Sequence, residues 1–435
     1  MTSTKFPPVQ EQLSYLKKGA AEVIREEELK SKLETAEQTG KPLRVYLGVD
    51  PTAPDIHLGH TVVLRKLKHF QDMGHTAVFL IGDFSAMIGD PTGQSETRPP
   101  LTREQVDANA KTYLDQVYKI LDPKHTEVRY NSEWLGKMSS FDVVRLCGHY
   151  RLARMLERED FRSRLEKNLP ISVHELLYPL LTAYDAVALE SDVEIGATEQ
   201  KFNLLVHRDI QREFGQASEV ALTMPILVGL DGERKMSKSL GNYVGITEAP
   251  SEMFGKLMSI SDELMWSYYE LLTDFPSTEI MRLKNDVREK TLHPMDAKMR
   301  LAHAIVAGFH GEEAAKKAAD EFQRVFRDRQ APEDPIECHI GTLEGGIVGF
   351  RVGTGVVVEQ GIYNVGPTGK TKLSRLLVLV ADISSKSEAE RLIKQGAVEI
   401  NGERVSDVKW EIDLSKPQQF LLRAGKKKFL RIIVE

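Results

Sequence analysis

Two short polar motifs, far apart in the chain, contain the residue types that bind phosphate. The first, His57-Leu58-Gly59-His60, follows Asp50-Pro51-Thr52 where an apolar strand pattern gives way to a helical one. The second, Lys235-Met236-Ser237-Lys238-Ser239, is a polar stretch after another apolar strand pattern. Imidazoles, the first amides of a helix and ammonium groups all donate to phosphate oxygens. Together the motifs indicate a triphosphate site, and therefore an enzyme that activates its substrate with a nucleotide.

Either motif alone is compatible with more than one kind of site. Gly59 lets a substrate approach the backbone closely. The histidines could instead be a metal-binding pair, although no nearby carboxylate or thiolate completes a ligand set, or a chance His-x-x-His at a helix start. The lysine motif could be a hydrophilic turn. Since both motifs follow strands of one predicted sheet, the phosphate-binding interpretation is favoured.

The elements around the first motif form a βαβ unit. Residues 44–49 read as a buried strand, residues 57–73 have apolar side chains at helical spacing until Gly74, and residues 76–82 read as a second strand. A parallel sheet of this kind binds ligands outside the carboxyl ends of its strands. The loop 89–93 is expected near that edge.

The second half of the fold is expected to follow a helical insertion. A capping box at Thr102 starts a helix to about Leu121, and residues 131–170 are largely helical. The second half is then predicted as a helix over 174–185, a turn over 194–200 and a strand over 225–228 that leads into the lysine motif.

The chain after residue 250 changes character twice. Helical patterns fill residues 251–329, whereas residues 330–369 are rich in Gly and Pro and read as a linker with short strands. In the last segment Ser387 is predicted to start a helix that ends at Gly396, and Asn401-Gly402 predicts a hairpin turn.

Composition limits the class of protein. A chain of 435 residues is long enough for two or three domains. The formal charge is −6, yet residues 368–435 contain fourteen Lys/Arg and nine Asp/Glu, which fits either a polyanion-binding tail or a solvated basic face. Two cysteines, no signal-peptide pattern and no long apolar run predict a cytoplasmic protein.

The two motifs resemble the signatures of class I aminoacyl-tRNA synthetases. Residues 46–53, 88–93 and 178–185 resemble bacterial tyrosyl-tRNA synthetases in particular, and the last segment resembles a small RNA-binding module found in that family. The resemblance implies an α/β protein with a Rossmann-like parallel-sheet catalytic domain, followed by an α-helical domain and a small α+β RNA-binding module. The expected boundaries are 1–250 (catalytic, insertion at about 131–170), 251–329 (anticodon-binding), 330–369 (linker) and 370–435 (RNA-binding).

The implied reaction is activation of L-tyrosine with ATP to tyrosyl-adenylate and pyrophosphate, then transfer of tyrosyl to the 3′ end of its tRNA. The catalytic residues would be His57, His60, Lys235 and Lys238. ATP would be bound by Asp50, Thr52, Gly59, Glu199, Lys235, Ser237, Lys238 and Ser239. Tyrosine would be bound by Tyr46, Asp90, Tyr178, Thr182, Asp185 and Gln200. RNA would be bound by Lys372, Arg375, Arg391, Lys394 and Arg404.

The substrate assignment depends most on Asp185, which would accept the proton of the tyrosine hydroxyl. Phenylalanine would leave that buried carboxylate without this partner. Without the resemblance, Asp185 would read as a helix-end carboxylate and Tyr178 as a core aromatic residue.

The chain departs from the family at four positions. Thr182 stands where the family usually has Gln, and Ala197 and Glu199 stand where it usually has Gly and Asp. Gln94 replaces a basic residue of a loop that retains Arg98. These departures affect individual contacts and affinities more than the reaction.

The resemblance also implies partners. Mg²⁺ would accompany ATP, with no metal held by the protein itself, and the protein would be a homodimer with the interface near residues 134–169. Two other functions remain open: a tryptophan-activating relative, against which Asp185 and the basic module argue, and a binding-only RNA-interacting paralogue, against which the intact phosphate-binding motifs argue.

Overall fold

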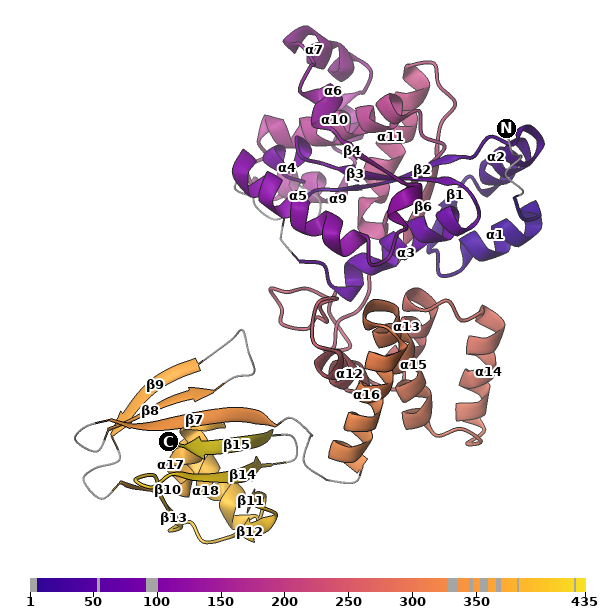
Figure 1. The fold of residues 1–435 in the computed structure, drawn as a ribbon. Coiled ribbons are helices and arrows are strands. Elements are labelled where there is room, and N and C mark those ends of the chain that lie inside the picture. The colour runs from indigo at the N-terminus through magenta and orange to yellow at the C-terminus, as the bar shows by residue number, and fades with distance from the viewer. Residues whose placement is uncertain are drawn as a thin grey trace. The chain divides into compact units, whose positions relative to one another are not determined.

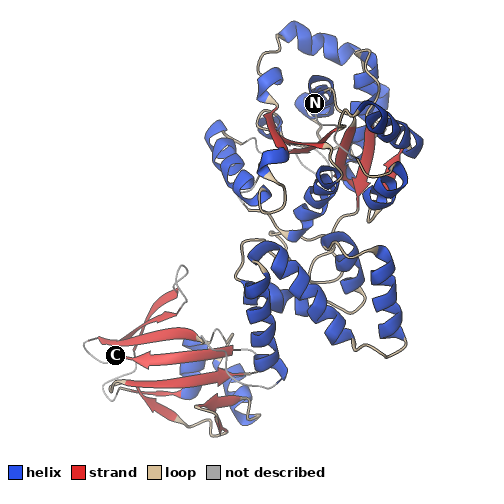
Figure 2. Ribbon diagram, turned by 45° about the vertical axis from the view of Figure 1, so that its right-hand side comes forward, coloured by secondary structure: helices blue, strands red, loops and turns tan. Residues whose placement is uncertain are grey.

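The structure, a computed structural model, describes residues 6–52, 55–90, 101–327, 335–343, 347–352, 359–364, 369–381, 383–425 and 428–435. The chain divides into two compact units, Met1–Ala315 and Lys316–Glu435 (Figure 1). In the first unit, helices cover both faces of a sheet of parallel strands with one antiparallel edge strand (Figure 2). The fold is therefore the α/β class that the sequence predicts.

The sheet of the first unit has the order β1-β6-β5-β2-β3-β4, in which β1 pairs antiparallel to β6 and the other neighbours are parallel. The strand order reverses between β2 and β5, so a crevice opens there at the carboxyl ends of the strands. The strands are β1 (Glu22–Ile24), β2 (Arg44–Val49), β3 (Thr76–Ile81), β4 (Thr126–Tyr130), β5 (Val193–Ala197) and β6 (Val220–Met224).

The βαβ unit predicted from the apolar pattern is confirmed. Strand β2, helix α3 (Leu58–Asp72) and strand β3 follow one another, and Gly74 adopts a positive φ of 91° just after the helix. The capping box at Thr102 is present at the start of α5. The helices near the N-terminus and around β3 are α1 (Val9–Lys17), α2 (Glu26–Thr39), α4 (Ser85–Ile88) and α5 (Arg103–Val117).

The insertion is helical, as expected, but the second half differs in two places. Residues 194–197 belong to strand β5 instead of forming a turn. The last strand of this sheet, β6, ends at Met224, just before the segment 225–228 that was predicted to be a strand. Pro225 has no N–H to donate to a sheet, which stops the pairing there. The helices are α6 (Ser132–Leu135), α7 (Ser140–Gly148), α8 (Leu152–Met155), α9 (Glu159–Glu166), α10 (Val173–Leu189) and α11 (Lys201–Glu213).

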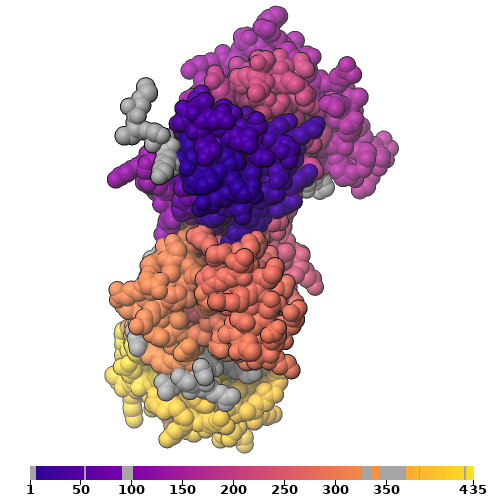
Figure 3. All heavy atoms as spheres, turned by 90° about the vertical axis from the view of Figure 1, so that its right-hand side faces the viewer, coloured from indigo at the N-terminus to yellow at the C-terminus, as the bar shows by residue number. Residues whose placement is uncertain are grey.

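Helices after residue 250 contact the sheet domain. The sequence analysis expected them to form a separate domain that begins at residue 251. The Lys18 ammonium donates to the carbonyls of Thr273 and Phe275, and the Tyr268 hydroxyl donates to Val228 O at 2.8 Å. In Figure 3 the orange helical residues of this unit lie against its indigo N-terminal residues. The helices are α12 (Pro250–Met258), α13 (Leu264–Leu272), α14 (Ser277–Arg288) and α15 (Pro294–His310). Helix α16 (Glu312–Phe322) contains the boundary between the two units.

The second unit contains a seven-stranded sheet with the order β12-β11-β14-β15-β7-β8-β9 and a buried core shared with two helices. The segment expected to be a linker supplies β7, β8 and β9, because β15 pairs in parallel with β7. The strands are β7 (Ile336–Leu343), β8 (Ile347–Val352), β9 (Glu359–Asn364), β10 (Lys370–Lys372), β11 (Val398–Ile400), β12 (Glu403–Val405), β13 (Glu411–Asp413), β14 (Gln418–Ala424) and β15 (Lys428–Val434).

In the second unit the predicted helix and hairpin are present, but the helix starts two residues earlier than predicted. Its helices are α17 (Leu373–Val380) and α18 (Lys386–Lys394). Ser385, not Ser387, caps α18 by accepting the N–H of Glu388. Asn401 and Gly402 both have positive φ in the hairpin between β11 and β12, as the Asn-Gly pair predicts.

Among the residues that the structure describes, no helix combines the length and apolar character needed to cross a membrane.

Candidate active site

A cavity of about 500 Å³ lies at the crevice where the strand order reverses. The histidine motif, the lysine motif and the residues expected to bind tyrosine line the same cavity. Its lining includes Tyr46, Asp50, Thr52, His57, Gly59, His60, Asp90, Tyr178, Thr182, Asp185, Glu199, Gln200, Lys235, Ser237 and Lys238. Ser239 is not part of the lining, but its hydroxyl lies 2.9 Å from that of Ser237.

Backbone pairing brings the two distant motifs together. His57 and Gly245 form an antiparallel bridge, and the N–H of Leu58 donates to Val244 O at 2.9 Å. The segment that follows the lysine motif is thereby fixed to the start of α3. Both motifs consequently open into one cavity.

The two histidines are neutral donors in this arrangement. Their rings stack at 3.9 Å, and each Nδ1 accepts a backbone N–H: that of Gly59 on His57 and that of His57 on His60. Burial lowers the pKa of His57 to about 3 and that of His60 to about 4, with the Lys238 charge adding to both effects. The remaining proton of each ring therefore sits on Nε2, where it can be donated to an anion.

Gly59 has a second reason to be glycine. A Cβ at this position would lie 2.9 Å from the His57 ring, which folds back over the first turn of α3. The sequence predicted only a close approach of substrate at this residue. The capping conformation of His57 itself requires the glycine.

The two lysines face carboxylates across the cavity. Lys235 Nζ lies 3.3 Å from Glu199, and Lys238 forms an ion pair with Asp55. Asn242 holds the motif from behind: it accepts the Ser237 N–H at 2.8 Å and donates to Lys235 O at 3.1 Å. Sequence reasoning missed Asp55 and Asn242, neither of which belongs to a recognisable motif.

Asp185 also lines the cavity and has two donors that the sequence did not indicate. Trp134 Nε1 donates to its Oδ1 at 2.7 Å, and Asn131 Nδ2 lies 3.3 Å from its Oδ2. Burial raises the pKa of Asp185, and these two hydrogen bonds oppose that rise. Trp134, expected only as part of the insertion near an interface, thus also orients a cavity carboxylate.

Three further residues expected to bind tyrosine have defined partners. The Tyr178 hydroxyl donates to Asp50 at 2.9 Å, an acid that was expected to contact ATP. Asp90 lies 3.9 Å from the buried Arg158. Gln200 accepts the Ala197 N–H at 2.9 Å, which leaves its side-chain NH₂ as the group that can donate to a carboxylate in the cavity.

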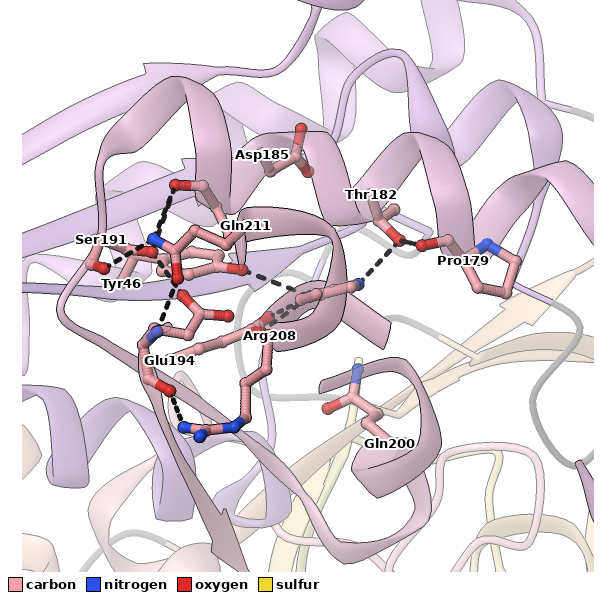
Figure 4. A network of polar contacts seen from close by, with 12 residues as sticks. Tyr46, Pro179, Thr182, Asp185, Ser191, Glu194, Gln200, Arg208 and Gln211 are labelled. Atoms are coloured by element: carbon pink, nitrogen blue, oxygen red, sulfur yellow. Dashed lines mark hydrogen bonds and ion pairs between the residues drawn. The ribbon is translucent and has the colours of Figure 1, made fainter. Parts of the chain in front are cut away.

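A buried polar cluster lies beneath Tyr46 and Thr182 (Figure 4). His207 contacts Glu194 through Nδ1 and Thr182 through Nε2, while Tyr46 and Glu219 both hydrogen-bond to Glu194. Sequence reasoning missed His207, Glu194 and Glu219, because each is a single polar residue in an otherwise apolar pattern.

Three members of this cluster, Glu194, His207 and Glu219, have ligand atoms within 4.8 Å of one another and could in principle hold a metal ion. Both ring nitrogens of His207 are already in hydrogen bonds, and Nδ1 lies 2.8 Å from the nearer oxygen of Glu194. Two ligands of a tetrahedral zinc ion stand about 3.3 Å apart. Protons satisfy this cluster better than a metal does.

Two groups of expected residues lie elsewhere. Gln94 and Arg98 fall outside the described residues. The five residues expected to bind RNA, Lys372, Arg375, Arg391, Lys394 and Arg404, are all exposed on the second unit.

Two family models match most of the chain. Residues 38–327 match the family model described as tRNA synthetases class I (W and Y), and residues 359–432 match that of the tyrosine-tRNA ligase SYY-like C-terminal domain. The chain therefore belongs to the class I tRNA synthetases of the tryptophan and tyrosine group.

Full-length relatives narrow the group. The chain is 51% identical to the tyrosine-tRNA ligase of Geobacter metallireducens, with 98% of this chain and 99% of the relative covered. It is 49% identical to that of Aquifex aeolicus over the same shares. The tyrosyl-tRNA synthetase of Archaeoglobus fulgidus, solved with L-tyrosine, superposes with a TM-score of 0.58 at 27% identity, covering 72% of this chain and all of that one. Within its class the chain is a member of the tyrosine-tRNA ligase family, whose members are aminoacyl-tRNA synthetases.

Proposed function

We propose that this chain activates L-tyrosine with ATP, giving tyrosyl-adenylate and pyrophosphate, and then transfers the tyrosyl group to the 3′ end of its tRNA. The observation that supports this most is that one cavity is lined by two neutral imidazoles, two lysines and Asp185. This set of groups suits a substrate that has both a phenol and a carboxylate and that reacts with a triphosphate.

The residues act by position and charge. The tyrosine carboxylate is already ionised and pyrophosphate is a good leaving group, so no protein nucleophile is required. His57 and His60 donate Nε2–H to the α-phosphate oxygens, and Lys235 and Lys238 neutralise the departing pyrophosphate. To do so, the lysines exchange Glu199 and Asp55 for phosphate.

Mg²⁺ fits this site only as a companion of ATP. Several cavity carboxylates already have partners: Asp50 has Tyr178 and Ser85, Asp55 has Lys238 and Glu199 has Lys235. They therefore do not form a set of oxygen ligands, and the phosphates and water would hold the ion. When bound, Mg²⁺ would add charge neutralisation on the pyrophosphate.

The two rival functions are less well supported. Asp185, with donors from Trp134 and Asn131, presents a hydrogen-bond acceptor suited to a phenol, and the relatives are tyrosine-tRNA ligases rather than tryptophan enzymes. A binding-only paralogue would not require the complete set of phosphate-directed groups that lines the cavity.

Tyrosine-dependent ATP–pyrophosphate exchange by the purified protein tests the proposal. We expect exchange with tyrosine and little with tryptophan or phenylalanine. Exchange with another amino acid but not with tyrosine would overturn the substrate assignment, and no exchange with any amino acid would favour the binding-only alternative.

The second unit is proposed to bind tRNA through its exposed basic residues, in a cytoplasmic setting. Arg391 and Arg404 are 63% and 72% exposed and form only loose ion pairs, at 3.4 and 3.5 Å, with Glu388 and Glu399. Exposed pairs of this kind contribute little stability, so a phosphate can replace the carboxylate.

The insertion is proposed to form a homodimer interface with a second copy of this chain. Large apolar side chains are exposed along α7, α8 and the start of α10: Phe141 (73%), Val144 (68%), Leu152 (60%) and Val173 (74%). Such side chains are usual at the centre of an interface between subunits. Analytical ultracentrifugation of Phe141→Asp should show a monomer, whereas Met281→Asp, at an exposed apolar residue outside this group, should leave the dimer intact. A monomeric wild-type protein would contradict the proposal.

A further inference from the structure

We infer that His207 is a positioning residue of the amino-acid pocket: its imidazole joins Thr182 on one wall to Glu194 and Tyr46 on the other, in place of the longer glutamine usual at position 182. This inference rests on the proposed function and extends it. It accounts for a departure from the family by a neighbour that is far away in the sequence.

His207 projects from one helix toward a second helix and a strand. It lies on α11, is buried, and lines the cavity together with Thr182 of α10 and Glu194 of β5. Its Nε2 lies 3.1 Å from Thr182 Oγ1, and its Nδ1 lies 2.8 and 3.0 Å from the two Glu194 oxygens. The ring thus connects both walls of the pocket through one rigid group.

The hydroxyl proton of Thr182 sets the direction of these hydrogen bonds. Thr182 Oγ1 lies 2.9 Å from Tyr178 O, which can only accept, so the threonine donates there. The contact with His207 then requires Nε2 to donate to Thr182. With its proton on Nε2, a neutral His207 must accept at Nδ1, where the nearest donor is a protonated Glu194 at 2.8 Å and the Tyr46 hydroxyl lies at 3.4 Å.

Burial supports this assignment of protons. It raises the pKa of Glu194 to about 7 and lowers that of His207 to about 4, so His207 is neutral at pH 7 and Glu194 keeps its proton below about that pH. Glu219, whose pKa burial also raises, hydrogen-bonds to Glu194 from the other side. Its Oε1 meets no N–H or O–H donor among the described residues, which fits a proton held between the two carboxyls.

Other charged groups lie near the cluster, but they do not change this assignment of donors and acceptors. Asp90 lies close enough to act on His207, and Asp185 and Glu219 act on Tyr46. Arg208 Nη1 donates to the backbone carbonyl of Glu219 and its Nη2 pairs with Glu28. The arginine therefore leaves the Glu219 carboxyl to Ser191 and Glu194.

The test separates the two ring nitrogens. His207→Gln places an amide near the depth of Nε2 and preserves the contact with Thr182, whereas His207→Asn places one near Nδ1 and preserves only the contact with Glu194. In the exchange assay, His207→Ala and His207→Asn should raise the KM for tyrosine roughly five- to tenfold, as expected for one lost hydrogen bond, with the KM for ATP within about twofold of wild type. His207→Gln should remain near wild type.

A second variant tests the relation to position 182. Thr182→Gln alone should raise the KM for tyrosine, because the longer side chain meets His207, and Thr182→Gln combined with His207→Ala should recover most of the loss. Additive losses in the double variant would overturn the inference. So would a folded His207→Ala, checked by its melting temperature, in which the KM for tyrosine is unchanged or rises no more than that for ATP. Absence of tyrosine-dependent exchange in the wild type would instead refute the proposed function.

Discussion

The groups directed at phosphate differ in charge, although the sequence presents them as two similar polar motifs. His57 and His60 accept backbone N–H groups at Nδ1 and are held neutral by burial. Lys235 and Lys238 carry the charge and already have carboxylate partners. In the proposed reaction the histidines would therefore supply oriented donors to phosphate, and the lysines would neutralise its charge.

Lys238→Ala tests this division. We expect the rate of adenylate formation to fall about 10²–10³-fold, the usual effect of removing one group that stabilises transition-state charge, while tyrosine binding changes less than about twofold. Rapid-quench measurement of adenylate gives the rate, and titration of the enzyme with tyrosine, followed by the protein's intrinsic fluorescence, gives the affinity for tyrosine. Asp55→Asn is the matched control: it releases Lys238 and should not lower the rate. Equal losses of rate and tyrosine affinity would contradict the assigned role.

Glu219 makes stability depend on pH. Its folded-state pKa is raised above the ordinary value of 4.5, and that of Glu194 is raised to about 7, so their contribution is complete below about pH 4.5 and is lost as the pH rises through the folded-state values. Glu219→Gln donates to Glu194 with a proton that does not titrate. At pH 8 the melting temperature of Glu219→Gln should equal or exceed that of wild type. At pH 5 its melting temperature should be lower relative to wild type than it is at pH 8. A difference independent of pH would exclude a shared proton.

The sequence singles out residues that belong to a motif, and these line one cavity, but it does not indicate contacts that join distant segments. The histidine and lysine motifs and Asp185 were all recognisable. His207 was not, because a single histidine in an amphipathic helix reads as an ordinary core residue, and its contact with Thr182 depends on how α10 packs on α11.

At the scale of elements, the lysine motif is a loop shaped by its surroundings. It follows the end of β6, and Asn242 fixes it through the Ser237 N–H and Lys235 O while also donating to Asp231 at 2.9 Å. The strand that the sequence placed over 225–228 does not join the sheet, because Pro225 ends the pairing. Instead Val228 forms an antiparallel bridge with Lys235, and the Met236 N–H donates to Leu227 O at 2.8 Å, so backbone pairing also holds the lysine motif.

Asn242→Ala should loosen this loop. We expect the KM for ATP to rise and adenylate formation to slow by about tenfold, corresponding to roughly 1.4 kcal/mol for the lost hydrogen bonds, with tyrosine affinity unchanged. Asn242→Asp can accept the Ser237 N–H, but it cannot donate to Lys235 O and it places a second carboxylate against Asp231, so it should lose at least as much as Asn242→Ala. If the KM for tyrosine rises in parallel, the effect is general unfolding rather than loss of loop position.

At the scale of the molecule, the sequence predicted the fold class and the helical patterns but misplaced one boundary. Gly and Pro in residues 330–369 suggested a linker, yet β7 pairs in parallel with β15, more than half of the second unit away along the chain. Local patterns carry no information on such pairing, because either strand could form with another neighbour.

Because β7 pairs with β15, a truncation that tests the second unit has to remove the whole sheet, including β7 to β9. Removal of residues 328–435 should leave tyrosine-dependent exchange within about threefold of wild type and lower tRNA charging strongly, with the loss relative to wild type greatest at low salt, where phosphate contacts contribute most to affinity. Removal of 368–435 alone should give an aggregation-prone protein, because β7 to β9 lose their partner and expose an edge. Unchanged charging after removal of 328–435 would refute the RNA-binding role of the second unit.

The bridge between His57 and Gly245 also bears on how the protein is made. Helix α3 emerges from the ribosome early, but the strand segment that holds its first turn follows most of the first unit. Contacts of such long sequence separation form late and slow the folding of a chain. A nascent chain that stops before Gly245 can contain every histidine and carboxylate of the site and still lack the backbone pairing that brings them together.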